Sequence, residues 1–559
     1  MANHAPSVFV PEAKGAVEIL MAAQPKQYLF IPLTILACSL LGGWLGKPTE
    51  VSAATATDDD IQTSLKAFTK VYEAVEQNFA DPLNPDKAIY NGAIPSMLHT
   101  LDPHSNFFDP KQFAAMREEQ RGQYYGVGML VGPNGAGPTA RTIVREPFTG
   151  SPAFKAGLRR GDIIMIVNDK KTDGLTTTEV TVLLKGQKGT PVQITVAREG
   201  SDKPLVFDVV RDEISRPSVA ESFWVKPGIA YLDVNLFNEN TSHEMEEQLN
   251  RLGENKIQGL VLDLRGNPGG LLNEGVEVAG HFLKKGMAIV KHRGRTSPEK
   301  VFTARRASSG REYPIVVLVD RQTASAAEIV SGALQDHDRG WIFGENTFGK
   351  GLVQTVFPLA ENAGLALTTY HYYTPSGRLI QRDYSNISFV EYYTHKNLET
   401  RNMNDVKMTD SGRTVYGGGG ISPDEKYQAV KLNKFQIDIK FRKEAFFHYA
   451  PKFFAERGSS KLPQEWTPDN ATMDAFHKFA LKEKVEFTEG EWIENLDWLK
   501  QELRQEVYIT AFGKESSDRV GVENDPTVQK GIEAMPKAKQ LIESAKKMLV
   551  QRMTVPQNN

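Results

Sequence analysis

Ser325 and Lys350 are the two residues whose types and surroundings favour covalent chemistry. Ser325 follows the apolar run at residues 314–320 (PIVVLVD) and stands where a helix is predicted to begin. Backbone amides at a helix N-terminus stabilise an oxyanion, so the position suits a nucleophile. A serine at this place also suits the N-cap of the helix, and position alone favours that structural role.

Lys350 lies between two apolar, strand-like segments and is flanked by Gly349 and Gly351. The strand-like segments at 352–359 and 365–373 follow close together and predict an antiparallel pair. Burial disfavours the charged form of a lysine, so a buried lysine can act as a base. Serine–lysine pairs are an established variant of the catalytic triad. We interpret Ser325 and Lys350 as nucleophile and general base, against the alternative of a loop lysine exposed to water.

Residues 344–351 (GENTFGKG) imitate a phosphate-binding loop up to the last position. There Gly351 replaces the Ser or Thr that such a loop needs, and the next residues predict a strand where the loop must open a helix. No Cys/His cluster has zinc spacing, and the net charge of −3 gives no general reason to expect nucleic acid. We therefore expect no nucleotide, no metal and no other cofactor.

The surroundings of the pair resemble one family closely. Residues 323–336 (TASAAEIVSGALQD) and 347–354 (TFGKGLVQ) are similar to two motifs of the C-terminal processing peptidases, also called tail-specific proteases. The resemblance implies that Ser325 is the nucleophile, that Lys350 is its base and that Gln354 orients the lysine. The family more often has Ser where this chain has Ala327. Further motifs follow in family order at 101–105 (LDPHS), 262–270 (LDLRGNPGG), 373–378 (YTPSGR) and 420–424 (GISPD).

The glycine-rich segment at 267–270 is predicted to lie at the carboxyl end of a central strand, where α/β sheets place their sites. Amides of Gly269 or Gly270, together with that of Ala326, are the expected oxyanion hole, although a simple turn leading into a helix is the alternative. Asp336 lies about three helical turns after Ser325 and is expected to act indirectly. A Ser/His/Asp arrangement through His337 is disfavoured because that histidine is about 18 Å from Ser325 along the same helix.

Residues 122–214 change to short strands, the first predicted over residues 125–131, and to glycine turns, and they resemble a PDZ domain. The similar segments are 125–129 (YGVGM), 157–164 (GLRRGDII) and 184–190 (LKGQKGT). The resemblance implies that a substrate's terminal carboxylate binds the loop formed by Tyr125, Gly126, Val127, Gly128 and Met129. PDZ domains add an extended peptide to a sheet edge. A β-module used only for packing is the alternative.

The elements that must position these residues predict a multidomain α/β (α+β) protein. The 559 residues exceed one ordinary domain, and 40% hydrophobic with 24% charged residues is typical of globular proteins. We expect an N-terminal region (1–56), a helical part of the protease (57–121), the PDZ domain (122–214), the protease core (215–425) and a C-terminal helical extension (426–559). The resemblance implies a mixed-sheet, crotonase-like fold for the core.

Residues 28–46 (YLFIPLTILACSLLGGWLG) are uncharged for about the thickness of a bilayer and are bounded by Lys26 and Lys47. They predict either a cleaved export signal or an uncleaved anchor, and the sequence leaves the true start at Met1 or Met21 open. We therefore expect a periplasmic protein, or one anchored to the inner membrane and facing outward.

The leading hypothesis is a serine endopeptidase that cuts exported proteins near their C-termini through an acyl-enzyme. Its expected partners are polypeptides with accessible C-termini and, through residues 28–46, a membrane. A catalytically silent PDZ scaffold in the cell envelope is the alternative. For the aromatic, charged tail (Phe446, Phe447, Tyr449, Phe453 and Phe454), core packing competes with a homodimer or adaptor interface. The physiological substrate and the effect of the PDZ domain on activity stay open.

Overall fold

The computed structural model describes residues 58–554, apart from residues 136, 138, 139, 221, 297, 306–310, 386–387, 395–401 and 459–460. The chain divides into two compact units, residues 1–85 and 86–559. The description of the first unit begins with helix α2 (Asp58–Asn78), which exposes most of its apolar residues. The predicted signal or anchor at residues 28–46 lies outside the described residues, and within them no helix is long and apolar enough to cross a membrane.

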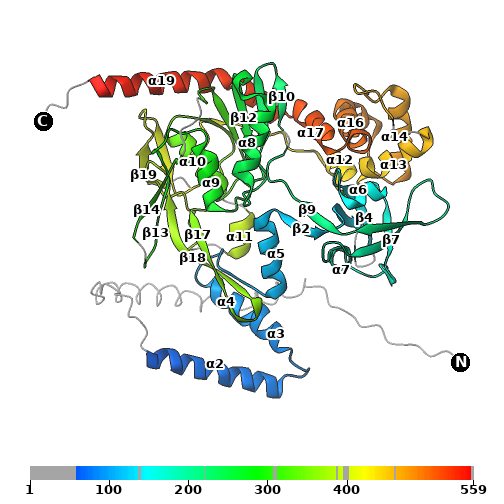
Figure 1. The fold of residues 1–559 in the computed structure, drawn as a ribbon, viewed down its shortest axis with the longest axis horizontal. Coiled ribbons are helices and arrows are strands. Elements are labelled where there is room, and N and C mark those ends of the chain that lie inside the picture. The colour runs from blue at the N-terminus through cyan, green and yellow to red at the C-terminus, as the bar shows by residue number, and fades with distance from the viewer. Residues whose placement is uncertain are drawn as a thin grey trace, which may run out of the picture. The chain divides into compact units, whose positions relative to one another are not determined.

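A six-stranded sheet forms the centre of the second unit (Figure 1). In spatial order its strands are β10 (Phe223–Lys226), β11 (Ile229–Asp233), β12 (Gly259–Asp263), β15 (Ile315–Val319), β16 (Trp341–Gly344) and β21 (Glu425–Lys426). The strands from β11 to β21 are parallel, and β10 is antiparallel to β11. This parallel arrangement requires crossover helices, which are α8 (Thr241–Leu252), α9 (Leu272–Gly280) and α10 (Ala326–Asp336).

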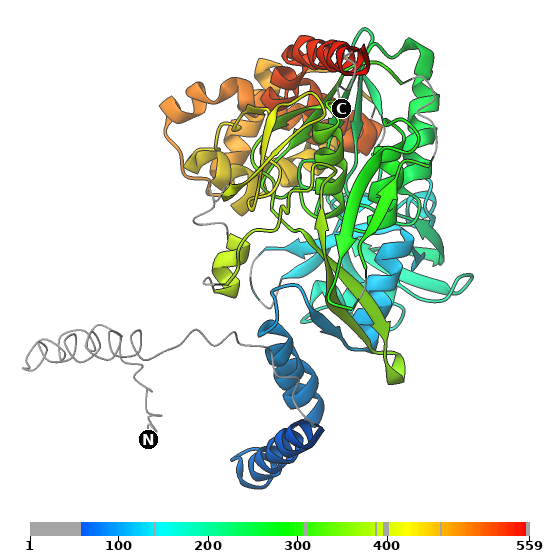
Figure 2. The same cartoon turned by 90° about the vertical axis from the view of Figure 1, so that its left-hand side faces the viewer.

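Strand β15 is buried along its whole length because both faces of the sheet are covered. Ile315, Val317 and Val319 join a core with residues of α8, α9 and α10. Val316 and Leu318 point to the opposite face, where they meet α18 (Pro526–Glu533) and α19 (Met535–Thr554). The continuous apolar run in the sequence therefore reflects a strand between two helical layers. Figures 1 and 2 show α19 (red) along this outer face.

A second, antiparallel sheet carries the segment after Lys350. Its strands are β1 (Asn106–Phe108), β13 (Ala288–Arg293), β14 (Lys300–Thr303), β17 (Leu352–Pro358) and β18 (Gly364–Tyr373). Strands β17 and β18 pair with each other, as their closeness in the sequence predicted. Their register shifts between Val353 and Gln354, so a β-bulge interrupts the ladder close to Lys350.

The PDZ-like module has a sheet in the order β3 (Met129–Asn134), β4 (Arg141–Pro147), β5 (Ile163–Val167), β7 (Pro191–Ala197) and β8 (Leu205–Val210), with β6 (Lys170–Lys171) beside β5. Helices α6 (Pro152–Ala156) and α7 (Thr177–Leu184) pack against it. A ribbon of β2 (Gln123–Gly126) and β9 (Asp212–Ser215) joins the two ends of the module. The prediction of one strand over residues 125–131 is wrong, because β2 ends at Gly126 and β3 begins at Met129.

The C-terminal helices form a bundle with a core of its own. It contains α13 (Ala445–Arg457), α14 (Asn470–Lys482), α15 (Glu489–Glu494) and α16 (Leu496–Phe512). Of the aromatic residues singled out in the tail, Phe446, Tyr449 and Phe453 are buried in this core and Phe454 packs against it. The ring of Phe447 faces the PDZ-like module, where the guanidinium groups of Arg145 and Arg160 lie 4.4 and 4.5 Å from its centre.

The remaining elements connect these parts. They are α3 (Pro85–Ala88), α4 (Ile94–His99), α5 (Pro110–Arg121), α11 (Phe389–Thr394), β19 (Asn402–Met408), β20 (Thr414–Gly417), α12 (Lys434–Ile437) and α17 (Lys514–Glu523), with short 3-10 or π-helical turns at Ile89–Ala93, Glu254–Lys256, Ala360–Asn362 and Asp438–Arg442. In the second unit, Tyr392 of α11 packs against Phe348, two residues before Lys350.

Candidate active site

Ser325 is held in a strained backbone conformation at the turn between β15 and α10. Its φ of 53° and ψ of −115° are unusual for a residue with a side chain. Ser325 is also the N-cap residue of α10: the amide of Glu328 donates to its backbone carbonyl at 2.9 Å, and the side chain of Glu328 accepts its backbone amide in a capping box. The N-cap role is therefore present, and the strained backbone is the feature that goes beyond it.

Lys350 lies in the loop between β16 and β17, and burial lowers the pKa of its ammonium group. The negative charges of Glu328 and Asp102 oppose this shift and raise the pKa, but burial is the larger effect. A lysine in this environment gives up its proton more easily than one in water. The environment therefore has the property that a general base requires.

Glu328 connects the backbones of Ser325 and Lys350. Its side chain is fully buried, and one carboxylate oxygen accepts hydrogen bonds from the amides of Ser325 and Lys350, both at 2.9 Å. The other oxygen accepts from the Thr347 hydroxyl at 2.5 Å and the Gly349 amide at 2.7 Å. Burial raises the pKa of Glu328, whereas these hydrogen bonds lower it. Sequence reasoning missed this residue, although its position three residues after Ser325 was a signal.

The glycine segment after β12 lies directly against Ser325. A Cβ atom on Gly269 would lie 2.6 Å from the Cβ of Ser325 and 2.9 Å from the amide nitrogen of Ala326. Gly269 and Gly270 have φ values of 96° and 141°. The amide of Gly269 donates to the Asn267 side chain at 2.8 Å. Two backbone hydrogen bonds join this segment to Phe237: the Phe237 amide donates to the Gly269 carbonyl, and the Leu271 amide donates to the Phe237 carbonyl. The amide of Gly270 takes part in neither bond.

Gln354 is placed on the bulged strand β17, next to β18. Its side-chain amide donates to the Thr368 hydroxyl at 3.0 Å. The backbone amide of Thr368 in turn donates to the Ser105 hydroxyl at 3.1 Å. Within the described residues, Gln354 thus contacts the neighbouring strand and makes no hydrogen bond to Lys350.

Asp336 lies at the opposite end of α10 from Ser325. Its carboxylate forms a buried ion pair with Arg378 at 2.7 Å and accepts a hydrogen bond from the Ser376 amide at 3.0 Å. The adjacent His337 contacts Asp410 at 2.7 Å, away from Ser325. The structure therefore brings neither Asp336 nor His337 to the nucleophile.

His104, in the motif at residues 101–105, lies within electrostatic range of Lys350. Burial and the charge of Lys350 lower the pKa of His104 to about 3, while Asp102 raises it. A ring nitrogen of His104 hydrogen-bonds the hydroxyl of Tyr392 on α11 at 2.9 Å. The ring of Phe348 packs beside both. This aromatic cluster covers part of the lysine side of the site.

The predicted carboxylate-binding loop connects β2 to β3 and contains Tyr125, Gly126, Val127, Gly128 and Met129. Strand β3 is at the edge of its sheet, paired only with β4, and α7 lies next to it. Leu130 on β3 and Val182 on α7 are exposed. An edge strand beside a helix, with exposed apolar side chains, has the geometry for adding a peptide strand.

In the part of the chain that the structure describes, no group of three or more His, Cys, Asp or Glu residues could hold a metal ion.

Two family models match the chain: peptidase family S41 at residues 228–386 and the PDZ domain at residues 117–209. A carboxy-terminal-processing protease of Bartonella bacilliformis is 38% identical over 337 residues, which cover 59% of this chain and 75% of that protein. The carboxy-terminal processing protease CtpB of Bacillus subtilis is 30% identical over 335 residues, with 59% and 68% covered. A solved photosystem II D1 C-terminal processing protease is 27% identical with a TM-score of 0.33, covering 65% of this chain and 87% of that chain.

Proposed function

This chain belongs to the S41 family of carboxy-terminal processing proteases, and we propose that it cleaves proteins near their C-termini with Ser325 as nucleophile and Lys350 as general base. It is a serine-type peptidase with a PDZ domain. The observation that carries the assignment is the buried carboxylate of Glu328, which accepts the backbone amides of both residues at 2.9 Å.

In the proposed reaction, the hydroxyl oxygen of Ser325 attacks the peptide carbonyl while Lys350 takes the hydroxyl proton. The protonated lysine then gives this proton to the leaving amine, and an acyl-enzyme remains on Ser325. Water hydrolyses the acyl-enzyme by the same route. Burial of Lys350 supports this role because it lowers the pKa of the ammonium group.

The amides of Ala326 and Gly270 are the proposed oxyanion donors. Ala326 is the first residue of α10, so its amide has no partner within the helix. Gly270 is preferred over Gly269 because the Gly269 amide already donates to Asn267. Gln354 donates to Thr368, so it orients Lys350 only after this hydrogen bond breaks. The alternative role of Gln354 is to hold the bulged strand β17 in place.

The test is cleavage of casein and of a short fluorogenic peptide by the wild type, Ser325→Ala and Lys350→Ala. We expect both variants to lose cleavage while keeping their far-UV circular dichroism and their affinity for peptide. Wild-type rates in Ser325→Ala would reject the nucleophile. Peptide binding by a wild type that cleaves nothing would favour the silent scaffold.

We further propose that the loop at residues 125–129 binds the substrate's terminal carboxylate, with the peptide added along the edge strand β3 beside α7. Its support is the unpaired edge of β3 and the PDZ family match. Identical peptides with a free or an amidated C-terminus separate this role from the chemistry. The amidated peptide should be cleaved more slowly by the wild type, and Val182→Asp should abolish the difference. Equal rates for the two peptides would contradict carboxylate capture.

The proposed location is the cell envelope, with exported proteins as substrates. The support is the apolar segment at residues 28–46, between Lys26 and Lys47. Cell fractionation combined with N-terminal sequencing of the mature protein distinguishes a cleaved signal from an anchor. Recovery of the uncleaved chain in the cytoplasm would contradict both.

A further inference from the structure

The hydroxyl of Tyr372 donates a hydrogen bond to the backbone carbonyl of Ser325 at 3.1 Å. Tyr372 belongs to β18 of the antiparallel sheet, whereas Ser325 stands at the turn after β15 of the central sheet. The tyrosine is 1% exposed and is part of the main hydrophobic core. Burial raises the pKa of its phenol well above the ordinary value, so the hydroxyl stays protonated and remains a donor. A side chain of one sheet thus holds the backbone of the proposed nucleophile in the other.

The backbone of Tyr372 also reaches the loop that carries Lys350. Its amide donates to the carbonyl of Gly351, the residue after the lysine, at 2.9 Å. On the other side of β18, Tyr372 is paired with His292 of β13. Neighbouring segments on both sides therefore fix the place of the ring. One rigid residue contacts the segments of both proposed catalytic groups.

The carbonyl that Tyr372 holds belongs to the peptide group whose amide is a proposed oxyanion donor. The carbonyl oxygen of Ser325 and the amide hydrogen of Ala326 lie in one plane and point in opposite directions, because a trans peptide group is rigid. Fixing the oxygen therefore fixes the direction of the N–H. The amides of Glu328 and Ile329 donate to the same carbonyl at 2.9 and 3.0 Å, so α10 holds it from within the helix and Tyr372 from outside.

Ser325 needs this support because its backbone is strained, with φ of 53° and ψ of −115°. Such conformations persist only when the surrounding structure fixes them. The glycine segment touches the same peptide group, since a Cβ atom on Gly269 would lie 2.9 Å from the amide nitrogen of Ala326. A relaxation of ψ at Ser325 would rotate the whole peptide group and turn the Ala326 amide away from the oxyanion.

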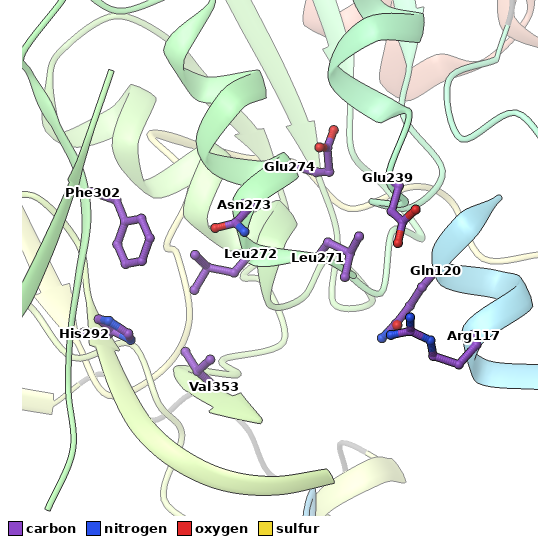
Figure 3. A pocket seen from close by; sticks show the side chains of 10 residues that line it. All are labelled: Arg117, Gln120, Glu239, Leu271, Leu272, Asn273, Glu274, His292, Phe302 and Val353. Carbon is purple, nitrogen blue, oxygen red and sulfur yellow. The ribbon is translucent and has the colours of Figure 1, made fainter. Parts of the chain in front are cut away.

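The ring of Tyr372 lies outside the pocket that opens beside the glycine segment. Leu271, the residue after Gly270, lines this pocket, and His292 and Val353 line another part of it (Figure 3). Tyr372 is not among the lining residues, although its strand partner His292 is. A change from Tyr to Phe at residue 372 therefore leaves the walls of the pocket as they are. Its effect on catalysis is that of the lost hydrogen bond.

We propose that Tyr372 is a positioning residue that keeps the peptide group of Ser325 and Ala326 turned so that the Ala326 amide faces the oxyanion. The inference rests on the proposed function of Ser325 and Ala326. The phenol of Tyr372 is buried and acts through the peptide group that it holds. An oxyanion forms only as the tetrahedral intermediate is approached, so the hydroxyl of Tyr372 contributes to the rate of cleavage and not to the binding of the substrate.

The test compares Tyr372→Phe with the wild type on a fluorogenic peptide. The kcat should fall by about tenfold or more, and by less than the roughly 100- to 1,000-fold that loss of a whole oxyanion donor costs. The KM and the acid limb of the pH profile should stay in place, because no charge near Lys350 changes. The fold should also be kept, since the Ser325 carbonyl retains two helix amides as donors.

A peptide aldehyde provides the second readout, because its carbon forms a reversible tetrahedral adduct with the Ser325 oxygen. Tyr372→Phe should weaken inhibition by the aldehyde by about the factor lost in kcat. The affinity for the uncleaved peptide, measured by fluorescence anisotropy in the Ser325→Ala background, should be the same with Tyr or Phe at residue 372. A residue needed only for folding would not separate these two affinities.

Tyr313→Phe is the matched control, because the buried hydroxyl of Tyr313 has no hydrogen-bond partner in the part of the chain that the structure describes. Tyr313 precedes β15, at the other end of that strand from Ser325. Its variant should keep the wild-type kcat and aldehyde affinity. A wild-type kcat in Tyr372→Phe, or a fall in kcat that the aldehyde affinity does not follow, would overturn the inference and leave the proposed reaction intact. Cleavage by Ser325→Ala would instead overturn the reaction on which the inference rests.

Discussion

Replacing Glu328 with Gln tests whether one buried carboxylate fixes the position of the nucleophile Ser325 relative to the base Lys350. Glu328 accepts four hydrogen bonds, two on each oxygen. Gln offers only one acceptor oxygen, so one pair of buried donors would face an NH₂ group. At about 1–3 kcal/mol for each unsatisfied donor, the folded state loses about 2–6 kcal/mol. A displacement of about 1 Å at either catalytic residue costs about 100-fold in rate, so kcat/KM should fall by that order.

The same substitution also has an electrostatic consequence with a definite sign. The charge of Glu328 raises the pKa of Lys350 and opposes the larger effect of burial, so removing this charge lowers the pKa further. Lys350 acts as a base when it is neutral. The acid limb of the profile of kcat/KM against pH should therefore move to lower pH in Glu328→Gln.

Initial rates on a fluorogenic peptide from pH 5 to 10 measure both effects. Glu345→Gln is the matched control, because Glu345 forms a partly exposed pair with Arg321 at 2.9 Å. Such surface pairs contribute about 0–1 kcal/mol, and the acid limb should not move. If Glu328→Gln lost activity but its acid limb stayed in place or moved to higher pH, the electrostatic link between Glu328 and Lys350 would be refuted.

Three further perturbations follow from contacts in the second unit. The pKa of His104 is lowered from 6.5 to about 3 in the folded chain, so between these pH values the unfolded chain binds more protons than the folded one. The free energy of unfolding should therefore fall as the pH drops through this window. Urea titrations at several pH values should show a smaller fall in His104→Asn. Arg378→Met leaves Asp336 buried without its ion-pair partner and should cost about 3–5 kcal/mol in denaturant unfolding, a cost that Asp336→Asn in the same chain should reduce. Arg160 of the PDZ-like module forms an ion pair with Glu506 of the helical bundle, so charge reversal at Arg160 should weaken this contact and speed limited proteolysis of the β2–β9 ribbon. Charge reversal at Glu506 in the same chain should restore resistance to the protease. A double variant as sensitive as the single one would contradict this.

The sequence was most informative where a single segment contains its own signal. The run at residues 314–320 predicted a strand covered on both faces, because an unbroken apolar pattern in a strand with one face in water would expose apolar side chains to solvent. The closeness of the two segments that became β17 and β18 predicted their antiparallel pairing. The error at residues 125–131 arose because an alternating pattern does not show a break in a strand at glycines.

The sequence was least informative where a contact joins distant segments. Glu328 looked like an ordinary acidic residue in the first turn of a helix, and nothing local shows that it accepts the amide of Lys350. His104 carried no chemical signal because its low pKa depends on burial and on the lysine that lies near it. The bond from Gln354 to Thr368 depends on the bulge in β17, which residue types alone do not specify.

The electrostatic surroundings of Lys350 join motifs that lie far apart in the chain. The charge of Asp102 acts on Lys350 and the charge of Lys350 acts on His104, yet the whole PDZ-like module is inserted between residues 101–105 and the protease core. The ribbon of β2 and β9 resolves this difficulty, because it pairs the two ends of the insertion from Gln123 to Ser215. The chain thus returns to the point where it left the core. The module can therefore bind a substrate tail without separating the turn at residues 101–105 from Lys350.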